Sequence, residues 1–214
     1  MSEYLRSSVR KYNVRHRLPN PAKAVLMVID MQEYFRGMAE PILPEIKRMI
    51  ASCHSAGVPI VYTYNCHSDP HDPQDGRMLA EWWGSDSVMM EGTKDVEIMP
   101  EVASTRQPSD LLIRKRGYSS FVRTDVDLEK MLREWKREEV IVCGVMTNLC
   151  CETAAREAFV RGFRVFFSID GTATSNDDLH ISTLKNLAHG FAYLVNAAQV
   201  EKACAAAAAL ASAT

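Results

Sequence analysis

The stretch VIVCGVMTNLCCETAAREA, residues 140–158, decides the fold of this chain. It opens with an apolar run that predicts a buried strand of a parallel sheet. Gly144 followed by Thr147 and Asn148, two residue types that cap helices, predicts the turn that opens the next helix. Cys150 then lies in the first turn of that helix, where unpaired backbone N–H groups and the helix dipole favour a thiolate. Cys150 is therefore a candidate nucleophile.

The same cysteine also has a purely structural interpretation. Cysteine is among the most buried residue types, so a cysteine near a strand end is more often a small core residue than a nucleophile. Cys150 and Cys151 are adjacent and point in different directions on a helix, so at most one of them faces the strand ends. The helix dipole alone does not choose between them.

Strand and helix patterns alternate along the whole chain. This alternation predicts a single-domain, three-layer α/β/α fold with a mostly parallel, doubly wound sheet. We expect an N-terminal arm over residues 1–20, the α/β domain over 21–202 and an Ala-rich tail over 203–214. The predicted strands are 24–30, 59–64, 110–115, 140–145, 164–170 and a short 192–195. The predicted helices are 128–135, 147–162, 177–188 and one that starts at residue 41 or 44 and ends at residue 56.

Three chemically capable residues fall at the carboxyl ends of three different predicted strands: Asp30, Lys115 and Cys150. A lysine at a strand end is ordinarily a solvated surface residue. The carboxyl ends of parallel strands meet at one edge of the sheet, where ligands bind in open α/β folds. A carboxylate there can take the thiol proton and an ammonium can hold the thiolate, so the three together favour nucleophilic catalysis.

The long polar section from residue 65 to residue 108 is of a size that is usually functional in a compact domain. Its Cys66, His67, Asp69, His71 and Asp72 could supply metal ligands. A His-x-x-x-His pair binds a metal well only on a helix, and the prolines in this segment argue against a regular helix. The segment therefore leaves both a metal site and a plain loop open.

The bulk composition limits the class of partner. The 214 residues include 25 Lys+Arg and 27 Asp+Glu, for a formal net charge of -2, and the charges are interspersed. That pattern predicts a small-molecule ligand rather than nucleic acid or an anionic membrane. No stretch has the length of a membrane span and no apolar signal segment follows Met1, so we expect a cytoplasmic protein. The six cysteines lack CxxC spacing, which agrees with a reducing compartment.

Three motifs in order resemble those of the isochorismatase-like cysteine hydrolases. They are VIDMQ at 28–32 with Phe35, KRGYSSF at 115–121 and GVMTNLC at 144–150. The similarity runs from about residue 24 to about residue 202, and within the family the chain looks most like the plant-type nicotinamidase branch. The resemblance implies the isochorismatase-like hydrolase fold.

The resemblance also implies a catalytic triad. The family's catalytic cysteine matches Cys150 and not Cys151, its aspartate matches Asp30 and its lysine matches Lys115. Its oxyanion hole would be the backbone N–H groups of Met146 and Cys150, shaped by a cis peptide that corresponds to Val145-Met146. The cysteine favours amide chemistry, because isochorismatases that hydrolyse a vinyl ether typically lack this nucleophile.

The substrate and the metal follow less directly from the resemblance. Candidates for substrate contact are Phe35 with Trp82 or Trp83, which could sandwich a planar ring, and Tyr118, although tryptophans more often serve in packing. Metal-binding nicotinamidases use an Asp-x-His pair and a later His, whereas residues 65–67 here read Asn-Cys-His. We therefore expect no required cofactor, with zinc at His67 and His71 as the alternative.

These observations favour a cysteine-dependent amidohydrolase, a hydrolase of non-peptide C–N bonds that converts a small carboxamide to its acid and ammonia through a thioester. Nicotinamide is the preferred substrate. Isochorismate, an N-carbamoyl compound and an aliphatic amide are alternatives, because the catalytic motifs do not set specificity. An inactive family member acting as a binding protein is a third hypothesis. The resemblance further implies a homo-oligomer, a dimer or tetramer.

Overall fold

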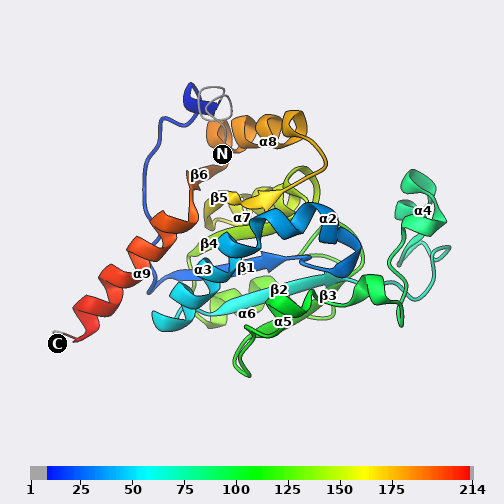
Figure 1. The fold of residues 1–214 in the computed structure, drawn as a ribbon, viewed down its shortest axis with the longest axis horizontal. Coiled ribbons are helices and arrows are strands. Elements are labelled where there is room, and N and C mark those ends of the chain that lie inside the picture. Colours follow the sequence, from blue (N-terminus) through cyan, green and yellow to red (C-terminus); the bar gives the residue numbers. More distant parts are fainter. Residues whose placement is uncertain (1–8, 213–214) are drawn as a thin grey trace.

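A six-stranded, all-parallel sheet forms the centre of the computed structural model, which describes residues 9–212 (Figure 1). Its strand order is β3-β2-β1-β4-β5-β6. The predicted doubly wound α/β fold is therefore confirmed. The strands are β1 (Ala24–Ile29), β2 (Ile60–Asn65), β3 (Leu111–Lys115), β4 (Glu139–Val145), β5 (Arg164–Ala173) and β6 (Ala192–Val195).

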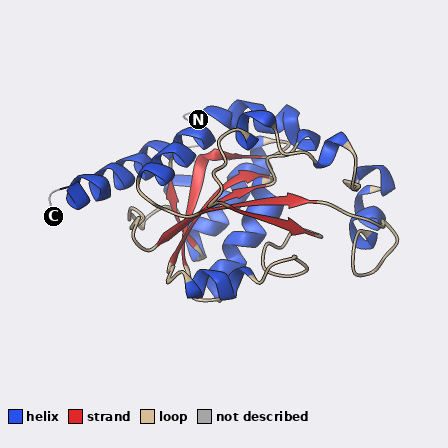
Figure 2. Cartoon of the chain, turned by 90° about the horizontal axis from the view of Figure 1, so that it is seen from below, coloured by secondary structure: helices blue, strands red, loops and turns tan. Residues whose placement is uncertain are grey.

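Side-chain alternation along the buried strands supplies two hydrophobic cores, one on each face of the sheet. Figure 2 shows helices on both faces of the sheet. In β1, Leu26 and Val28 enter one core, and Val25 and Met27 enter the other. The first core is covered by α3 (Leu43–Ser55), α5 (Pro100–Ala103) and α9 (Ala197–Ser212), and the second by α6 (Leu128–Glu134), α7 (Glu152–Val160) and α8 (Asp177–Gly190).

Local capping explains where two of these helices begin. The Asp127 side chain accepts a hydrogen bond from Lys130 N at the start of α6. The Asn176 side chain accepts a hydrogen bond from Leu179 N in the same way, and α8 begins at the next residue, Asp177. The short elements between β1 and α3 are η1 (Glu33–Phe35), α2 (Arg36–Ala39) and η2 (Glu40–Ile42).

The long section after β2 splits into a packed part and a projecting part. Its elements are α4 (Arg77–Trp83), η3 (Ser85–Ser87), η4 (Lys94–Val96) and α5. Met99 and Val102 are buried in the first core, whereas α4 stands away from the sheet at the right of Figure 1. None of the side chains of α4 is buried.

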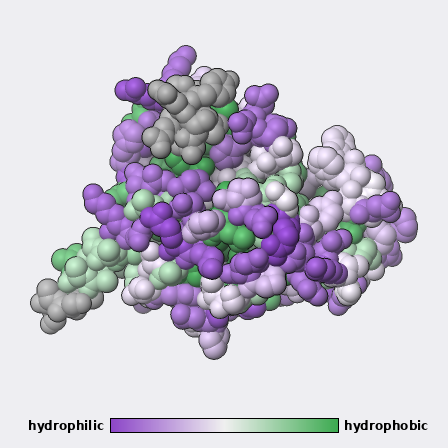
Figure 3. Space-filling model, in the orientation of Figure 1, coloured by the Kyte–Doolittle hydropathy of each residue, from purple (hydrophilic) through white to green (hydrophobic). Residues whose placement is uncertain are grey.

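The two ends of the described chain behave differently. The extended segment after residue 13 lies along the domain, where the Arg15 guanidinium donates to the carbonyl oxygens of Ala188 and His189 at the end of α8. Helix α9 runs into the predicted Ala-rich tail and projects from the body, with apolar side chains on its outer turns (Figures 1 and 3). The other parts of the predicted arm and tail, residues 1–8 and 213–214, lie outside the described residues. The domain boundaries stay a prediction.

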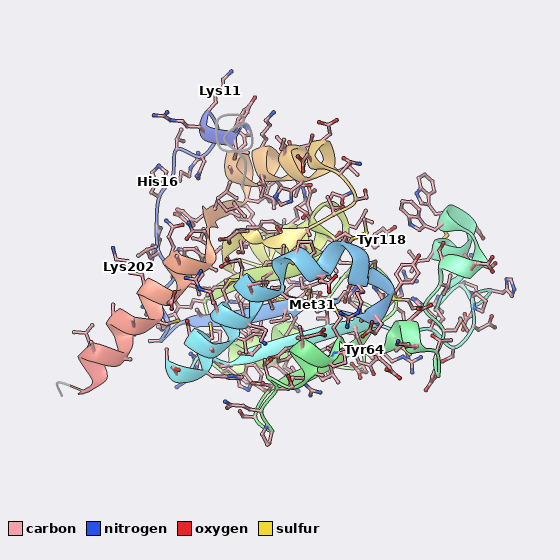
Figure 4. All side chains as sticks on the ribbon, viewed as in Figure 1. Lys11, His16, Met31, Tyr64, Tyr118 and Lys202 are labelled. Carbon is pink, nitrogen blue, oxygen red and sulfur yellow. The ribbon has the colours of Figure 1, made fainter. Side chains whose placement is uncertain are left out.

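The winding direction of the sheet reverses between β1 and β4, which is where doubly wound sheets open a crevice at the carboxyl ends of their strands. Figure 4 shows Met31, Tyr64 and Tyr118, which follow or end β1, β2 and β3, at this same end of the sheet. Within residues 9–212, no helix has the length and apolar character that crossing a bilayer requires.

A close backbone approach marks this reversal point. Gly144 pairs with Ile29 across β1 and β4 and has a φ of +115°. A Cβ atom at this position would overlap the carbonyl oxygen of Ile29 and lie 2.7 Å from its nitrogen. Glycine is therefore required by space and by conformation.

Replacing Gly144 by alanine should lower the free energy of unfolding by about 2–4 kcal/mol, because the methyl group meets backbone that cannot move aside. Urea unfolding followed by circular dichroism measures the loss. Gly190→Ala is the matched control, since a Cβ there meets open space. Equal stabilities for the two variants would contradict the role assigned to this close approach.

Candidate active site

The three residues singled out at the strand ends lie together in the structure. The Lys115 ammonium is 2.7 Å from a carboxylate oxygen of Asp30, 3.3 Å from Cys150 Sγ and 2.7 Å from the carbonyl oxygen of Gly117. Its three N–H groups therefore each have a partner. Asp30 and Lys115 are fully buried, and Cys150 is 3% exposed.

Strand β2 supplies two further donors to the Asp30 carboxylate. Thr63 Oγ1 donates to one carboxylate oxygen at 2.8 Å, and Asn65 Nδ2 donates to the other at 3.1 Å. Sequence reasoning did not identify Thr63, and it considered Asn65 only as a metal ligand. The sequence does contain an indication of their role. Thr63 and Asn65 are polar residues at the end of an apolar strand, and because they are two positions apart they lie on the same face.

Cys150 lies in a wider turn than the predicted α-helical one. Residues Thr147–Cys151 form a π-helical turn ahead of α7, in which the N–H groups of Leu149 and Cys151 both donate to the carbonyl oxygen of Met146 at 3.1 Å. Such turns often occur at functional sites. The peptide bond between Val145 and Met146, just before this turn, is cis. The use of the Met146 and Cys150 N–H groups as an oxyanion hole stays a prediction.

The predicted helix caps at Thr147 and Asn148 are wrong, because their side chains make longer-range bonds instead. Thr147 Oγ1 hydrogen-bonds His180 Nδ1 of α8 at 2.9 Å. Asn148 Oδ1 accepts a hydrogen bond of 2.6 Å from Thr174 Oγ1, just after β5. The two side chains thus fasten the turn that carries Cys150 to two other parts of the fold.

Burial decides the protonation of the resting site. It raises the pKa of the Cys150 thiol to about 12, although the Lys115 ammonium acts in the opposite direction. The shift is opposite to the one predicted from the helix terminus, and burial is its largest cause. Burial acts to lower the pKa of Lys115, but the Asp30 carboxylate and Cys150 outweigh it, so this pKa is raised. Asp30 contacts the same Lys115 ammonium as the sulfur does, and it is the group that can accept the thiol proton.

The aromatic candidates for substrate contact divide between two cavities at the edge of the sheet. Phe35 lines one of about 600 Å³, beside residues 173–175 that follow the end of β5. Trp82 and Tyr118 line another of about 230 Å³. Trp83 donates from Nε1 to the Tyr118 hydroxyl at 2.6 Å. The structure thus brings the tryptophans close to Tyr118 but places Phe35 in a separate hollow.

The metal candidates do not gather. His67 is fully buried and its Nδ1 hydrogen-bonds Asp75 at 2.8 Å, which leaves Nε2 buried without a partner. That nitrogen could bind a metal, but His71 is exposed, and the Asn65 amide is engaged by Asp30 and Gly117. No group of three or more His, Cys, Asp or Glu side chains suited to a metal occurs among residues 9–212. The residues present therefore do not fit the Asp-x-His type of metal site.

Comparison with known sequences identifies close relatives. The model of the isochorismatase domain family matches residues 24–199. The chain is 50% identical to Nicotinamidase 3 of Arabidopsis thaliana over 190 residues, which is 89% of this chain and 93% of the relative. It is 31% identical to the isochorismatase of Bacillus subtilis over 83% of this chain but 57% of that protein.

Solved structures agree with the sequence relatives. A cysteine hydrolase from Pseudomonas syringae pv. phaseolicola superposes with a TM-score of 0.78 at 26% identity, covering 90% of this chain and 97% of that chain. N-carbamoylsarcosine amidase from Thermoplasma acidophilum superposes with a TM-score of 0.68 at 23% identity, covering 82% and 96%, and so shares the fold.

Replacing Lys115 by methionine should slow alkylation of Cys150, because the ammonium is the partner that lowers the pKa of this thiol. We expect iodoacetamide to react about tenfold more slowly at pH 8, because the fraction of thiolate falls when the ammonium is removed. Mass spectrometry of the Cys150 peptide gives the rate. Lys202→Met, at an exposed site on α9 far from the centre (Figure 4), is the control. An unchanged rate in Lys115→Met would show that the ammonium does not act on the sulfur.

Proposed function

The chain belongs to the isochorismatase family, and we propose that it hydrolyses nicotinamide, a small planar carboxamide, to nicotinic acid and ammonia. The observation that carries the proposal is the buried contact of Lys115 with both Asp30 and Cys150. That arrangement is suited to a cysteine hydrolase, because it pairs a nucleophile with a proton acceptor and a cation. The choice of nicotinamide is supported by the 50% identity to Nicotinamidase 3.

The first half-reaction forms a thioester. Asp30 accepts the proton of the Cys150 thiol as the sulfur attacks the carboxamide carbon. Because the thiol is neutral at rest, proton transfer and attack are coupled. The carbonyl oxygen becomes an oxyanion, which the N–H groups of Met146 and Cys150 stabilise. The C–N bond then breaks, and the proton held by Asp30 passes to the leaving nitrogen, which departs as ammonia.

The second half-reaction regenerates the thiol. Asp30 takes a proton from a water molecule, whose oxygen attacks the thioester carbon. The C–S bond breaks, the acid leaves, and the proton returns to the sulfur. Lys115 stabilises the negative charge that alternates between Asp30 and Cys150 in both halves, and its contact with Gly117 keeps it in place.

The remaining attributes are inferred from the resemblance. We propose that the reaction needs no metal or other cofactor, that the protein works in the cytoplasm and that it assembles as a dimer or tetramer. Phe35, Trp82, Trp83 and Tyr118 are the proposed contacts of the substrate ring.

Wild-type protein should release ammonia from nicotinamide, and Cys150→Ala should lower kcat by at least about a thousandfold because no thioester can form. A coupled ammonia assay measures both. Cys151→Ala, which removes the neighbouring buried thiol, should remain active and serves as the control. The same assay with N-carbamoyl and aliphatic amides tests the alternative amide substrates, and product analysis tests isochorismate. Full turnover in Cys150→Ala would exclude the covalent mechanism.

Treatment with EDTA followed by gel filtration should leave the rate of ammonia release unchanged, because Asp75 engages His67 Nδ1 and the Asn65 amide is engaged by Asp30 and Gly117. Metal content by mass spectrometry and activity are measured on the same sample. A loss of activity that added zinc restores would show that a metal takes part.

A further inference from the structure

Asn65 occupies the middle of the candidate active site. It is the last residue of β2, the strand that lies between β1, which ends before Asp30, and β3, which ends with Lys115. Asn65 is also the register partner of Lys115 across β2 and β3. Its side chain is buried, with 3% of the residue exposed. The topology of the sheet therefore places this amide among the three catalytic candidates.

Every polar atom of the Asn65 side chain has a partner in the site. Nδ2 donates to Asp30 Oδ2 at 3.1 Å and lies 3.9 Å from Cys150 Sγ, within the reach of a hydrogen bond to sulfur. Oδ1 accepts a hydrogen bond of 3.2 Å from the N–H of Gly117. The carbonyl oxygen of that same Gly117 accepts the third N–H of Lys115. One amide group is thus connected to all three residues.

These partners determine the orientation of the amide. The Gly117 N–H requires an acceptor, so the oxygen faces Gly117 and the NH₂ group faces Asp30 and the sulfur. The opposite orientation would set the amide oxygen against a carboxylate oxygen. The Gln32 side chain fixes the backbone behind it, since its Nε2 donates to Asn65 O at 2.9 Å and its Oε1 accepts from Asn65 N at 2.8 Å.

We propose that Asn65 is a positioning residue of the active centre, which holds the Asp30 carboxylate and the Cys150 sulfur with its two N–H groups and holds Lys115 through Gly117. An amide suits this place because it donates to two groups that become negative without adding charge of its own. The proposal rests on the proposed function for its turnover readout only, since the reactivity of the thiol can be measured without any substrate.

Two isosteric substitutions separate this role from a merely structural one. Asn65→Asp keeps an oxygen that can accept from Gly117 N–H but replaces the donors with a second carboxylate beside Asp30 and the sulfur. Asn65→Leu removes both functions at similar volume. The measured quantities are the pH dependence of Cys150 alkylation by iodoacetamide, kcat and KM for nicotinamide, and the melting temperature. Asn186→Asp, the same chemical change at an exposed position of α8, is the matched control.

The expected result is that Asn65→Asp alkylates at least about tenfold more slowly at pH 8 and loses kcat by a similar or larger factor, as for the loss of a hydrogen bond to a charged group. Asn186→Asp should match the wild type in both. If Asn65→Asp matches the wild type and only Asn65→Leu is impaired, Asn65 serves the Gly117 turn alone and the proposal is overturned.

Two further outcomes keep the test decisive. If the added charge prevents Asn65→Asp from folding, Asn65→Ala replaces it, and an alkylation profile unchanged from the wild type overturns the proposal. If wild-type protein releases no ammonia from any amide but the alkylation of Asn65→Asp is still slowed, the proposed function fails and the role of Asn65 stands.

Discussion

A fully buried ammonium–carboxylate pair is the constraint on which the rest of the site depends. Removing Lys115 and Asp30 from water costs several kcal/mol per ion, and their mutual attraction offsets this cost only if their remaining polar groups are hydrogen-bonded. The fold meets that condition with neutral donors and acceptors from β2 and from the turn after β3. The sulfur of Cys150 contacts the same Lys115 ammonium that is paired with the Asp30 carboxylate. The result is a thiol that keeps its proton, with the acceptor Asp30 already beside it, until a carbonyl carbon is at hand.

The sheet topology explains how residues so far apart in the sequence meet. Asp30 and Cys150 follow the two central strands, on either side of the point where the winding direction reverses. Lys115 comes from β3, with β2 between it and Asp30, so its long side chain must cross the end of β2. The polar residues at that strand end line this crossing. Gly144 lets the two central strands lie close enough for the turn after β4 to reach the same place.

Sequence patterns predicted the architecture and the main site residues, because both depend on strong local signals. Apolar runs gave the six strands, and the placement of Asp30, Lys115 and Cys150 at strand ends followed from them. The motifs then separated Cys150 from Cys151. The patterns could not show that Thr147 and Asn148 bond to distant residues instead of capping a helix, since those partners are set by tertiary packing. Nor could they show the net effect of burial on the thiol, or the separation of Phe35 from the tryptophans, which depends on where the section around α4 lies.

Strand β3 is the outermost strand on its side of the sheet, yet it carries the only cation that contacts the sulfur within residues 9–212. Elements with fewer buried contacts generally open at a lower free energy than the strands at the centre of a core. The segment around Thr124 pairs with Lys115 and partly covers this edge. Heating should therefore end turnover when β3 detaches from the sheet. The temperature of inactivation is then lower than the temperature at which the two hydrophobic cores unfold.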